Sequence, residues 1–359
     1  MAAAVEHDAL HAAIEDSLRR RFDDGIATAR AYGEEFAALW LTTAAGAVGG
    51  KLLRPRLLVD AFRELTGAAD PSDAVELATA VELLHYSFLL HDDVIDGDVV
   101  RRGRPNVIGR LRDDVDRADA PDVERATHWG RTGAILMGDL LLTAAVLGFA
   151  RVDVPSAVRS RLLTTLENAV SETVAGELAD VGFSDGVLAA DLPSILQMTA
   201  RKTAVYSVEL PLRAAAVLAG RSIDAEEALA AIGRRLGLAY QLQDDLLSVF
   251  GDPQEHGKDP HTDLREGKET AIIAYARMTS AWASIAPRFG TADLTGAEAA
   301  ELRLRLRDCG AEGFVENLVA EQLDDAIGLI DEAVRGGLLP DGMRSVLLGF
   351  VERISGRTA

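Results

Sequence analysis

The sequence contains very little cysteine and few aromatic residues. Cys309 is the only cysteine among 359 residues, which excludes an internal disulfide and a metal site built from cysteines, and which fits a reducing cytoplasm. Aromatic residues make up 5% of the chain, whereas hydrophobic residues as a whole make up 48%. Because alanine and leucine are abundant, this composition favours helices over sheets. We therefore predict an all-α globular protein.

Basic residues are also scarce relative to acidic ones. The chain has 37 Lys and Arg against 57 Asp and Glu, and its net charge is -20. This balance argues against a nucleic-acid partner, because a phosphate backbone requires clustered Lys and Arg. An anionic small-molecule substrate would need divalent cations and a few well-placed basic residues.

Signals for export or membrane insertion are missing from the pattern. Residues 1–18 carry Glu6, Asp8 and Glu15 and do not show a cationic start followed by an apolar core, so we predict no signal peptide. The most apolar stretch, residues 134–150, is interrupted by Asp139 and is shorter than the roughly 20 residues that cross a bilayer. We interpret it as a buried helix and expect no transmembrane segment.

The periodicity of apolar residues predicts a succession of helices with short connections and no convincing strand. No linker divides them, so we predict a single domain over residues 1–359 with a motif-bearing core at about 45–275. The expected helices cover residues 8–32, 73–95, 132–150, 156–182, 191–217 and 225–249. A further helix is expected to end at Gly49-Gly50, another to begin at Pro55, and the remainder at 270–356 to be helical with one break at 336–342. The expected irregular segments are a loop at 98–105, a mobile connection or solvated helix at 110–125 and a lid loop at 251–268.

Two aspartate clusters stand within apolar stretches of predicted helices. One contains Asp92, Asp93 and Asp96, and the other contains Asp244 and Asp245. Isolated carboxylates are costly to bury, so a cation is expected beside them. Asp92 and Asp96 share a helix face, and such oxygen donors suit Mg²⁺, which prefers carboxylates, waters and substrate phosphates. The pattern indicates an enzyme that handles diphosphates.

Five motifs in this order resemble those of the trans-isoprenyl diphosphate synthase family. They are Gly49-Gly50-Lys51-Leu52-Leu53-Arg54-Pro55, Leu90-His91-Asp92-Asp93-x-x-Asp96, Arg101-Arg102-Gly103-Arg104-Pro105, Lys202-Thr203 and Gln241-Leu242-Gln243-Asp244-Asp245. The resemblance, most like a bacterial geranylgeranyl diphosphate synthase, runs from about Lys51 to Thr270. It implies a helical bundle around a deep central cavity, in which both aspartate clusters hold three Mg²⁺ ions and an allylic diphosphate.

The same resemblance implies a prenyltransferase that joins isopentenyl diphosphate head to tail (1'-4) with allylic diphosphates. The diphosphate would leave the allylic substrate, which becomes a carbocation. Metal ions and cationic side chains would stabilise the negative charge of the departing diphosphate. No protein general base is expected, because the released diphosphate can accept the proton. The resemblance assigns catalytic roles to Arg101, Lys202, Thr203 and Gln241.

Basic residues are expected to hold the two diphosphates. The resemblance assigns isopentenyl diphosphate to Lys51, Arg54, His85 and Arg102. It assigns the allylic diphosphate to Arg101, Lys202 and Lys258, with Lys268 in the loop that closes over the metals. Arginine suits this task because its planar fork binds two phosphate oxygens at once.

Three positions depart from the family pattern. Ser248 stands where the second cluster usually has a third aspartate, so metal binding is expected to be looser. Leu52 stands where an arginine is common, and Glu177, in Gly176-Glu177-Leu178-Ala179-Asp180, stands where glutamine is frequent. Whether Glu177 joins the metal shell is left open by the sequence.

Product length is expected to depend on the helix that precedes Asp92. Phe88 lies four residues before Asp92, Ser87 lies five before it, and Leu84 lies eight before it. The resemblance implies that bulk at Ser87 and Phe88 shortens the product. These residues favour geranylgeranyl diphosphate, with farnesyl diphosphate as the alternative.

Three other functions compete with this interpretation. A class I terpene cyclase would not need Lys51 and Arg54 to bind isopentenyl diphosphate, and it would have other residues in place of the second aspartate pair. A non-catalytic partner subunit would have lost one acidic motif, and a calcium-binding scaffold would need a loop of alternating acids with a Gly turn. The resemblance also implies a homodimer.

Overall fold

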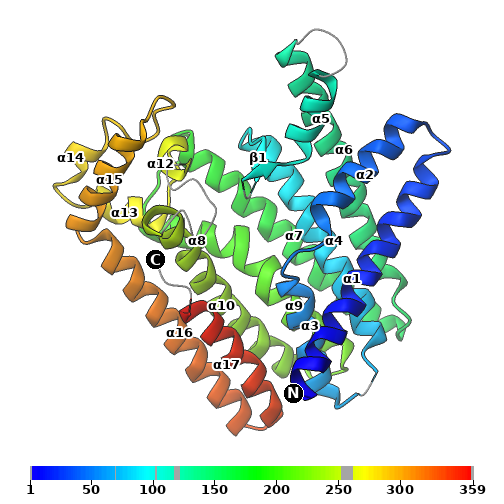
Figure 1. Cartoon of the computed structure of the whole chain (residues 1–359). Coiled ribbons are helices and arrows are strands. Elements are labelled where there is room, and N and C mark those ends of the chain that lie inside the picture. Colours follow the sequence, from blue (N-terminus) through cyan, green and yellow to red (C-terminus); the bar gives the residue numbers. More distant parts are fainter. Residues whose placement is uncertain (1, 69, 102, 117–121, 252–261, 357–359) are drawn as a thin grey trace. The chain divides into compact units, whose positions relative to one another are not determined.

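The computed structural model describes residues 2–68, 70–101, 103–116, 122–251 and 262–356. Contacts between Cα atoms divide the chain into two compact units, residues 1–163 and 164–359. Helices make up nearly all the regular structure of both units (Figure 1). The all-α prediction is confirmed, whereas the single domain stays a prediction.

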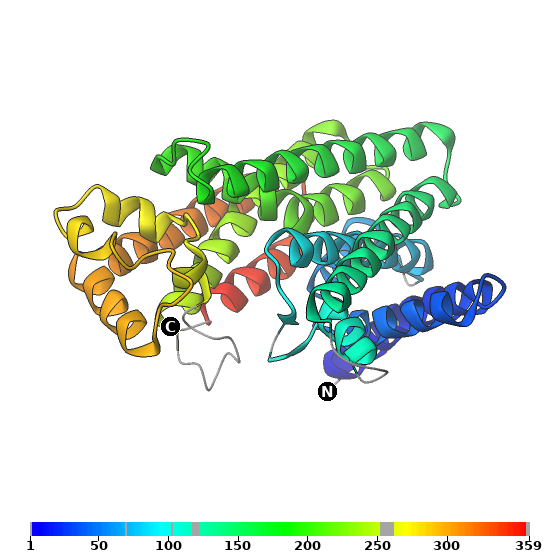
Figure 2. The same ribbon diagram turned by 90° about the horizontal axis from the view of Figure 1, so that it is seen from above.

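The first unit is built around α4, which packs along α6 and also contacts α1 and α3. The helices α1 and α2 lie side by side in both views, coloured blue (Figure 2). The elements of this unit are α1 (Ala2–Ala29), α2 (Glu34–Ala47), α3 (Leu53–Thr66), α4 (Ser72–Ile95), β1 (Val100–Arg101), β2 (Arg104–Pro105), α5 (Val107–Asp116) and α6 (Val123–Arg151). The boundary with the second unit falls within α7 (Ser156–Ser184).

The second unit is organised by α10, which packs against α9, α16 and a π-helical stretch, η1. This stretch joins α8 to α9. The elements that follow α7 are α8 (Leu192–Thr199), η1 (Ala200–Glu209), α9 (Leu210–Leu218), α10 (Ile223–Phe250), α12 (Thr262–Glu266), α13 (Ala271–Arg277), α14 (Trp282–Ile285), α15 (Gly296–Asp308), α16 (Ala311–Arg335) and α17 (Asp341–Ser355).

Local signals explain where the long helices begin and end. The α4 helix follows the predicted range 73–95 and is succeeded by Gly97, whose φ of 75° lies in the left-handed region that favours glycine. Ser222 caps α10 by accepting a hydrogen bond from the N–H of Ala225. Thr295 and Glu298 form a reciprocal capping box on α15. These side chains satisfy backbone groups that the helix itself leaves unpaired.

Several predicted segments differ from the structure. The loop at 98–105 contains a two-stranded antiparallel ribbon, because Val100 and Arg101 pair with Pro105 and Arg104. The charged stretch at 110–125, predicted as a mobile connection or a solvated helix, is helical as far as Asp116 in α5 and again from Val123 in α6, which matches the helical alternative. The predicted helix at 191–217 is three elements, since η1 changes its hydrogen-bond register. The predicted lid loop contains the short helix α12.

The buried helix predicted at 134–150 is a helix with one buried face. The α6 helix is 29 residues long, and its buried face includes Met137, Leu141 and Phe149. Leu136 and Leu140 on the same helix are exposed. Within the described part of the chain, α6 is the one helix that is long and apolar enough to cross a membrane by length and composition, and 39% of its most apolar window is buried.

Candidate active site

The first aspartate cluster lies at the carboxyl end of α4. Asp92 and Asp93 are in its last turn, and the backbone N–H of Asp96 donates to Asp92 O at 2.8 Å. The side chain of Asp93 is 4% exposed, whereas that of Asp92 is 23% exposed. The helix therefore presents Asp92 and Asp96 one turn apart and keeps Asp93 inside.

Arg101 holds this cluster from the neighbouring ribbon. Its Nε donates to Asp93 Oδ1 at 2.9 Å, and its Nη2 donates to Asp93 Oδ1 at 2.6 Å and to Asp92 Oδ2 at 2.9 Å. The short strand β1 directs Arg101 back toward the helix end. In this structure the predicted allylic-diphosphate ligand is thus paired with two predicted metal ligands.

Burial changes the titration of the groups around Arg101. It raises the pKa of Asp93 to about 6, although the charge and hydrogen bonds of Arg101 counteract it. Burial also raises the pKa of Tyr86 to about 12, and the charge of Asp93 adds to that effect. For Arg101, burial lowers the pKa, but Asp93 and Asp92 outweigh it, so the pKa is raised and the side chain stays charged.

The residues predicted to set product length lie in unlike surroundings on α4. Phe88 is partly exposed, and at about 100° per residue it shares a face with Asp92. Leu84, one turn earlier, is fully buried. Ser87 is also fully buried, about 140° around the helix from Asp92, and no group among the described residues hydrogen bonds to its hydroxyl. His85 is partly exposed on the same helix.

Two of the predicted isopentenyl-diphosphate ligands, Lys51 and Arg54, flank a strained residue in the chain. Among the residues that the structure describes, Leu52 is the one non-glycine residue with a positive φ, at 46°. Such a conformation is uncommon for a bulky side chain, and strained residues cluster at functional sites. Its side chain is 2% exposed, which fixes the turn between exposed Lys51 and the first helical turn of α3, where Arg54 lies.

The second aspartate cluster lies near the carboxyl end of α10. Asp244 and Asp245 are both partly exposed, and Gln241 Nε2 donates to Asp245 Oδ1 at 2.9 Å, one helical turn away. Ser248 follows on the next turn and is 9% exposed. Gln241 thus orients one carboxylate and leaves its neighbour turned to a different face of the helix.

Lys202 binds two carboxylates of α7. Its Nζ lies 2.6 Å from Asp180 Oδ2 and 2.9 Å from Glu177 Oε2, and all three side chains are at most 20% exposed. Thr203 follows it in η1 and is partly exposed. Sequence reasoning gave no role to Asp180. The available signal was its position three residues after Glu177, which places both acids on one helix face.

Of the remaining predicted ligands, the structure describes Lys268, which follows α12. Lys268 is partly exposed, and its Nζ lies 3.8 Å from Glu266 Oε2 at the end of α12. Arg102 and Lys258 lie outside the described residues.

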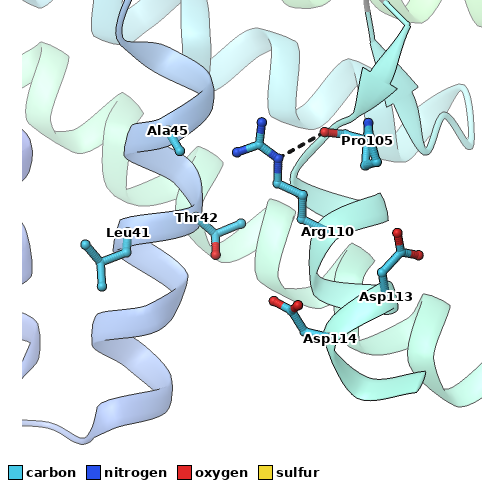
Figure 3. Close-up of a pocket in the computed structure, with 7 residues that line it drawn as sticks. All are labelled: Leu41, Thr42, Ala45, Pro105, Arg110, Asp113 and Asp114. Carbon is cyan, nitrogen blue, oxygen red and sulfur yellow. Dashed lines mark hydrogen bonds between the residues drawn. The ribbon is translucent and has the colours of Figure 1, made fainter. Parts of the chain in front are cut away.

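A separate hollow of about 420 Å³ lies between α2 and α5 in the first unit (Figure 3). Arg110 points toward Pro105 and donates from Nε to its carbonyl at 3.1 Å. Asp113 and Asp114 complete the polar lining, while Leu41 lies on α2. None of the predicted site residues that the structure describes lines this hollow, and its mixed charges do not form a cradle for an anion.

The donors at both aspartate clusters fit magnesium chemically. Asp92, Asp96 and Asp244 supply partly exposed carboxylate oxygens, the ligand type that Mg²⁺ prefers, without any nitrogen or sulfur donor. Asp93 fits less directly, because Arg101 already occupies Oδ1. The two clusters lie in different units of the chain.

Comparisons with known proteins support one family. The polyprenyl synthetase profile matches residues 40–286. A geranylfarnesyl diphosphate synthase of Aeropyrum pernix is 32% identical over 317 residues, covering 85% of this chain and 91% of the relative. A (2E,6E)-farnesyl diphosphate synthase of Mycobacterium tuberculosis is 34% identical over 226 residues, covering 63% of this chain and 56% of the relative.

Solved structures agree with the sequence relatives. The crystal structure of a geranylgeranyl pyrophosphate synthase from Corynebacterium glutamicum, complexed with isoprenyl diphosphate and magnesium, superimposes with a TM-score of 0.88 at 27% identity. The match covers 98% of this chain and 99% of that chain. It confirms the isoprenoid-synthase type of fold, and the chain therefore belongs to the polyprenyl synthetase family of prenyltransferases.

Proposed function

We propose that this protein condenses isopentenyl diphosphate with an allylic diphosphate, head to tail, and that its main product is geranylgeranyl diphosphate. The observation that carries the proposal is the retention of both aspartate clusters together with two cations held by carboxylates: Arg101, which pairs with Asp92 and Asp93, and Lys202, which pairs with Glu177 and Asp180 in the second unit. A class I cyclase has no need of Lys51 and Arg54, and a silent partner subunit has no need of both clusters.

Magnesium would be held by Asp92, Asp93 and Asp96 and by Asp244 and Asp245, with three ions in all, and would stabilise the departing diphosphate. Asp93 becomes an available ligand once Arg101 turns from its carboxylate to the negatively charged substrate. Arg101 and Lys202 are the two cations that gain a new anionic partner in this step, because both are held by carboxylates in the structure. Lys258 and Lys268 would complete the grip on the allylic diphosphate.

The second diphosphate requires a separate cradle. Lys51, Arg54, His85 and Arg102 would hold isopentenyl diphosphate, and buried Leu52 fixes the turn between the first two of these residues. Thr203 and Gln241 would stabilise positive charge on the isoprenoid through their oxygens. Water has to be kept away from the carbocation, which is the role proposed for the segment at 251–268.

Phe88 supports a product of intermediate length. It is partly exposed on the Asp92 face of α4, whereas Ser87 and Leu84 are fully buried. We expect Phe88 to end the space for the growing tail, with Leu84 behind it. Relatives named for farnesyl and geranylfarnesyl products mark the alternatives on either side.

The direct test is incubation of purified protein with Mg²⁺, isopentenyl diphosphate and each short allylic diphosphate in turn. Chromatography of the dephosphorylated products should show a twenty-carbon alcohol. A fifteen-carbon alcohol would identify a farnesyl diphosphate synthase, and no elongation with any starter would overturn the synthase proposal in favour of a cyclase or a partner subunit.

We also propose a homodimer that works in the cytoplasm as one domain. Exposed apolar side chains along α6, among them Trp129 at 49% and Leu136 at 51%, provide a surface that a second copy would cover. Sedimentation velocity distinguishes the dimer from a monomer, and Leu136→Glu should shift the protein to monomer.

A further inference from the structure

The π-helical stretch η1 carries Lys202 near its start and Glu209 at its end. π-helices occur mostly as single-turn bulges, and they are frequent at functional sites. Here the π register extends over ten residues, and after it the N–H of Leu210 bonds to Val205 O, five residues back. Because ordinary α-helical bonding is the alternative for the same residues, neighbouring elements must hold this register.

Two glycines allow neighbouring helices to approach the backbone of η1. A Cβ on Gly176 of α7 would lie 2.3 Å from the backbone N of Lys202. A Cβ on Gly237 of α10 would lie 2.6 Å from the Cα of Ala204. In both cases the obstacle is backbone, which cannot rotate away as the end of a side chain can. A methyl group at either glycine therefore has to displace the segment that carries Lys202.

The end of η1 is held by a buried carboxylate. Glu209 is 4% exposed, and it accepts hydrogen bonds from Arg234 Nε at 2.9 Å and from Arg213 Nη1 at 3.3 Å. Arg234 also bonds to Glu172 of α7, and Arg213 bonds to Glu226 of α10. This network links the end of η1 to the two helices that carry the glycines.

The beginning of η1 is held by the Lys202 side chain. Both of its carboxylate partners, Glu177 and Asp180, lie on α7 just after Gly176. Backbone contact and ion pairs therefore fix the same lysine against the same helix. If η1 changed to the α-helical register, Lys202 would rotate relative to residues beyond Glu209 and could no longer satisfy both sets of contacts.

We propose that Gly237 and Glu209 are positioning residues for Lys202: they hold the π-helical register of η1 and so aim the Lys202 ammonium at its anionic partner. The choice of allylic diphosphate as that partner rests on the proposed function. The structural part of the inference concerns residues 172–237 of the second unit alone.

Gly237→Ala and Glu209→Gln test the proposal, with Gly328→Ala as the matched control because a Cβ at Gly328 meets nothing within 4 Å. We expect kcat/KM for the allylic diphosphate to fall by about 10-fold or more in Gly237→Ala, and less in Glu209→Gln, since small misplacements near the chemistry are costly. The KM for isopentenyl diphosphate should stay within about twofold. A loss of active protein alone would lower kcat for both substrates and leave each KM unchanged.

A double-mutant cycle with Lys202→Ala shows whether Gly237 acts through Lys202. The double variant should be no worse than Lys202→Ala, and multiplicative losses would overturn the proposal. If Lys202→Ala leaves the allylic KM unchanged, the role of Lys202 in the proposed function is wrong, and a crystal structure of Gly237→Ala then decides the inference. An intact π register and Lys202–Asp180 ion pair in that crystal would overturn it, whereas their loss would support it.

Discussion

The two aspartate clusters are built in opposite ways. In the first, Asp93 is buried and Arg101 neutralises it, so that charge is compensated before any ligand binds. In the second, Asp244 and Asp245 are partly exposed, and the side-chain amide of Gln241 donates a hydrogen bond to Asp245. Burial makes the ion pair with Arg101 important for Asp93, whereas water reaches the carboxylates of the second cluster. Loss of the charged partner of Asp93 should therefore lower the stability of the folded protein strongly.

The largest expected effect is loss of a metal ligand from either cluster. Asp92→Ala and Asp244→Ala should each lower kcat by about 1,000-fold, because each removes charge stabilisation from the departing diphosphate. Steady-state kinetics at saturating Mg²⁺ provides the measurement. Asp113→Ala on α5 is the control and should keep activity within about twofold. Comparable activity in Asp244→Ala and this control would restrict the metal site to the first cluster.

The next effect separates the clusters by stability. Arg101→Met leaves Asp93 buried without its guanidinium, which should lower the free energy of unfolding by about 3–5 kcal/mol. Arg104→Met, on the paired strand of the same ribbon, removes an exposed arginine and should change it by less than about 0.5 kcal/mol. Urea unfolding without metal measures both. Equal losses would mean that the ribbon, not the ion pair, is the stabilising feature.

The raised pKa of Asp93 predicts a pH dependence of stability in the metal-free protein. With a pKa of about 6 when folded and 3.8 as the ordinary value, the folded state holds the proton more tightly. Stability from this group is therefore greatest below pH 3.8 and falls as the pH rises to about 6, by at most about 3 kcal/mol.

Asp93→Asn removes that dependence. The variant should be more stable than the parent above pH 6, and the advantage should shrink toward pH 4, as followed by urea unfolding across this range. Asp245→Asn in the second cluster is the comparison, and its effect on stability is expected to be smaller because this carboxylate is partly exposed. A pH-independent difference for Asp93→Asn would contradict the assignment of the raised pKa to Asp93.

A qualitative effect on product length is expected from α4. Phe88→Ala should lengthen the product by one isoprene unit, because it opens the Asp92 face one turn before the cluster. Leu90→Val trims the opposite face of the same helix and should keep the product unchanged. Chromatography of the dephosphorylated products gives the chain lengths. An unchanged product in Phe88→Ala would assign that side chain to packing.

The smallest effect is expected from restoring the third acid of the second cluster. Ser248→Asp adds a carboxylate one turn after Asp244 and should increase the apparent affinity for Mg²⁺ by about two- to fivefold, about 0.4–1 kcal/mol. Ser248→Asn has the same shape without the charge and should leave the affinity unchanged. Titration of activity with Mg²⁺ measures the difference. If Ser248→Asp lowers activity and Ser248→Asn does not, the cost of burying an additional carboxylate at this position outweighs its contribution to Mg²⁺ binding.

Sequence reasoning was most successful where the signal is local. The helix at 73–95 was predicted within one residue, because an uninterrupted apolar pattern ends at Gly97. It was less successful at 191–217, where the residues favour a helix but cannot specify a π register, since that register depends on glycines of two other helices. The ribbon at 98–105 was missed because two-residue strands carry no periodicity.

The sequence by itself determined the all-α class, the family and the positions of both aspartate clusters in the chain, since these depend on composition and on the order of short motifs. Only the tertiary structure decided that Arg101 is held by Asp92 and Asp93, that Lys202 is paired with Glu177 and Asp180, and that Ser87 is buried while Phe88 is not. The physical reason is that helix formation follows from near neighbours in the chain. The charge state and orientation of a side chain depend on atoms that distant segments of the chain bring close to it.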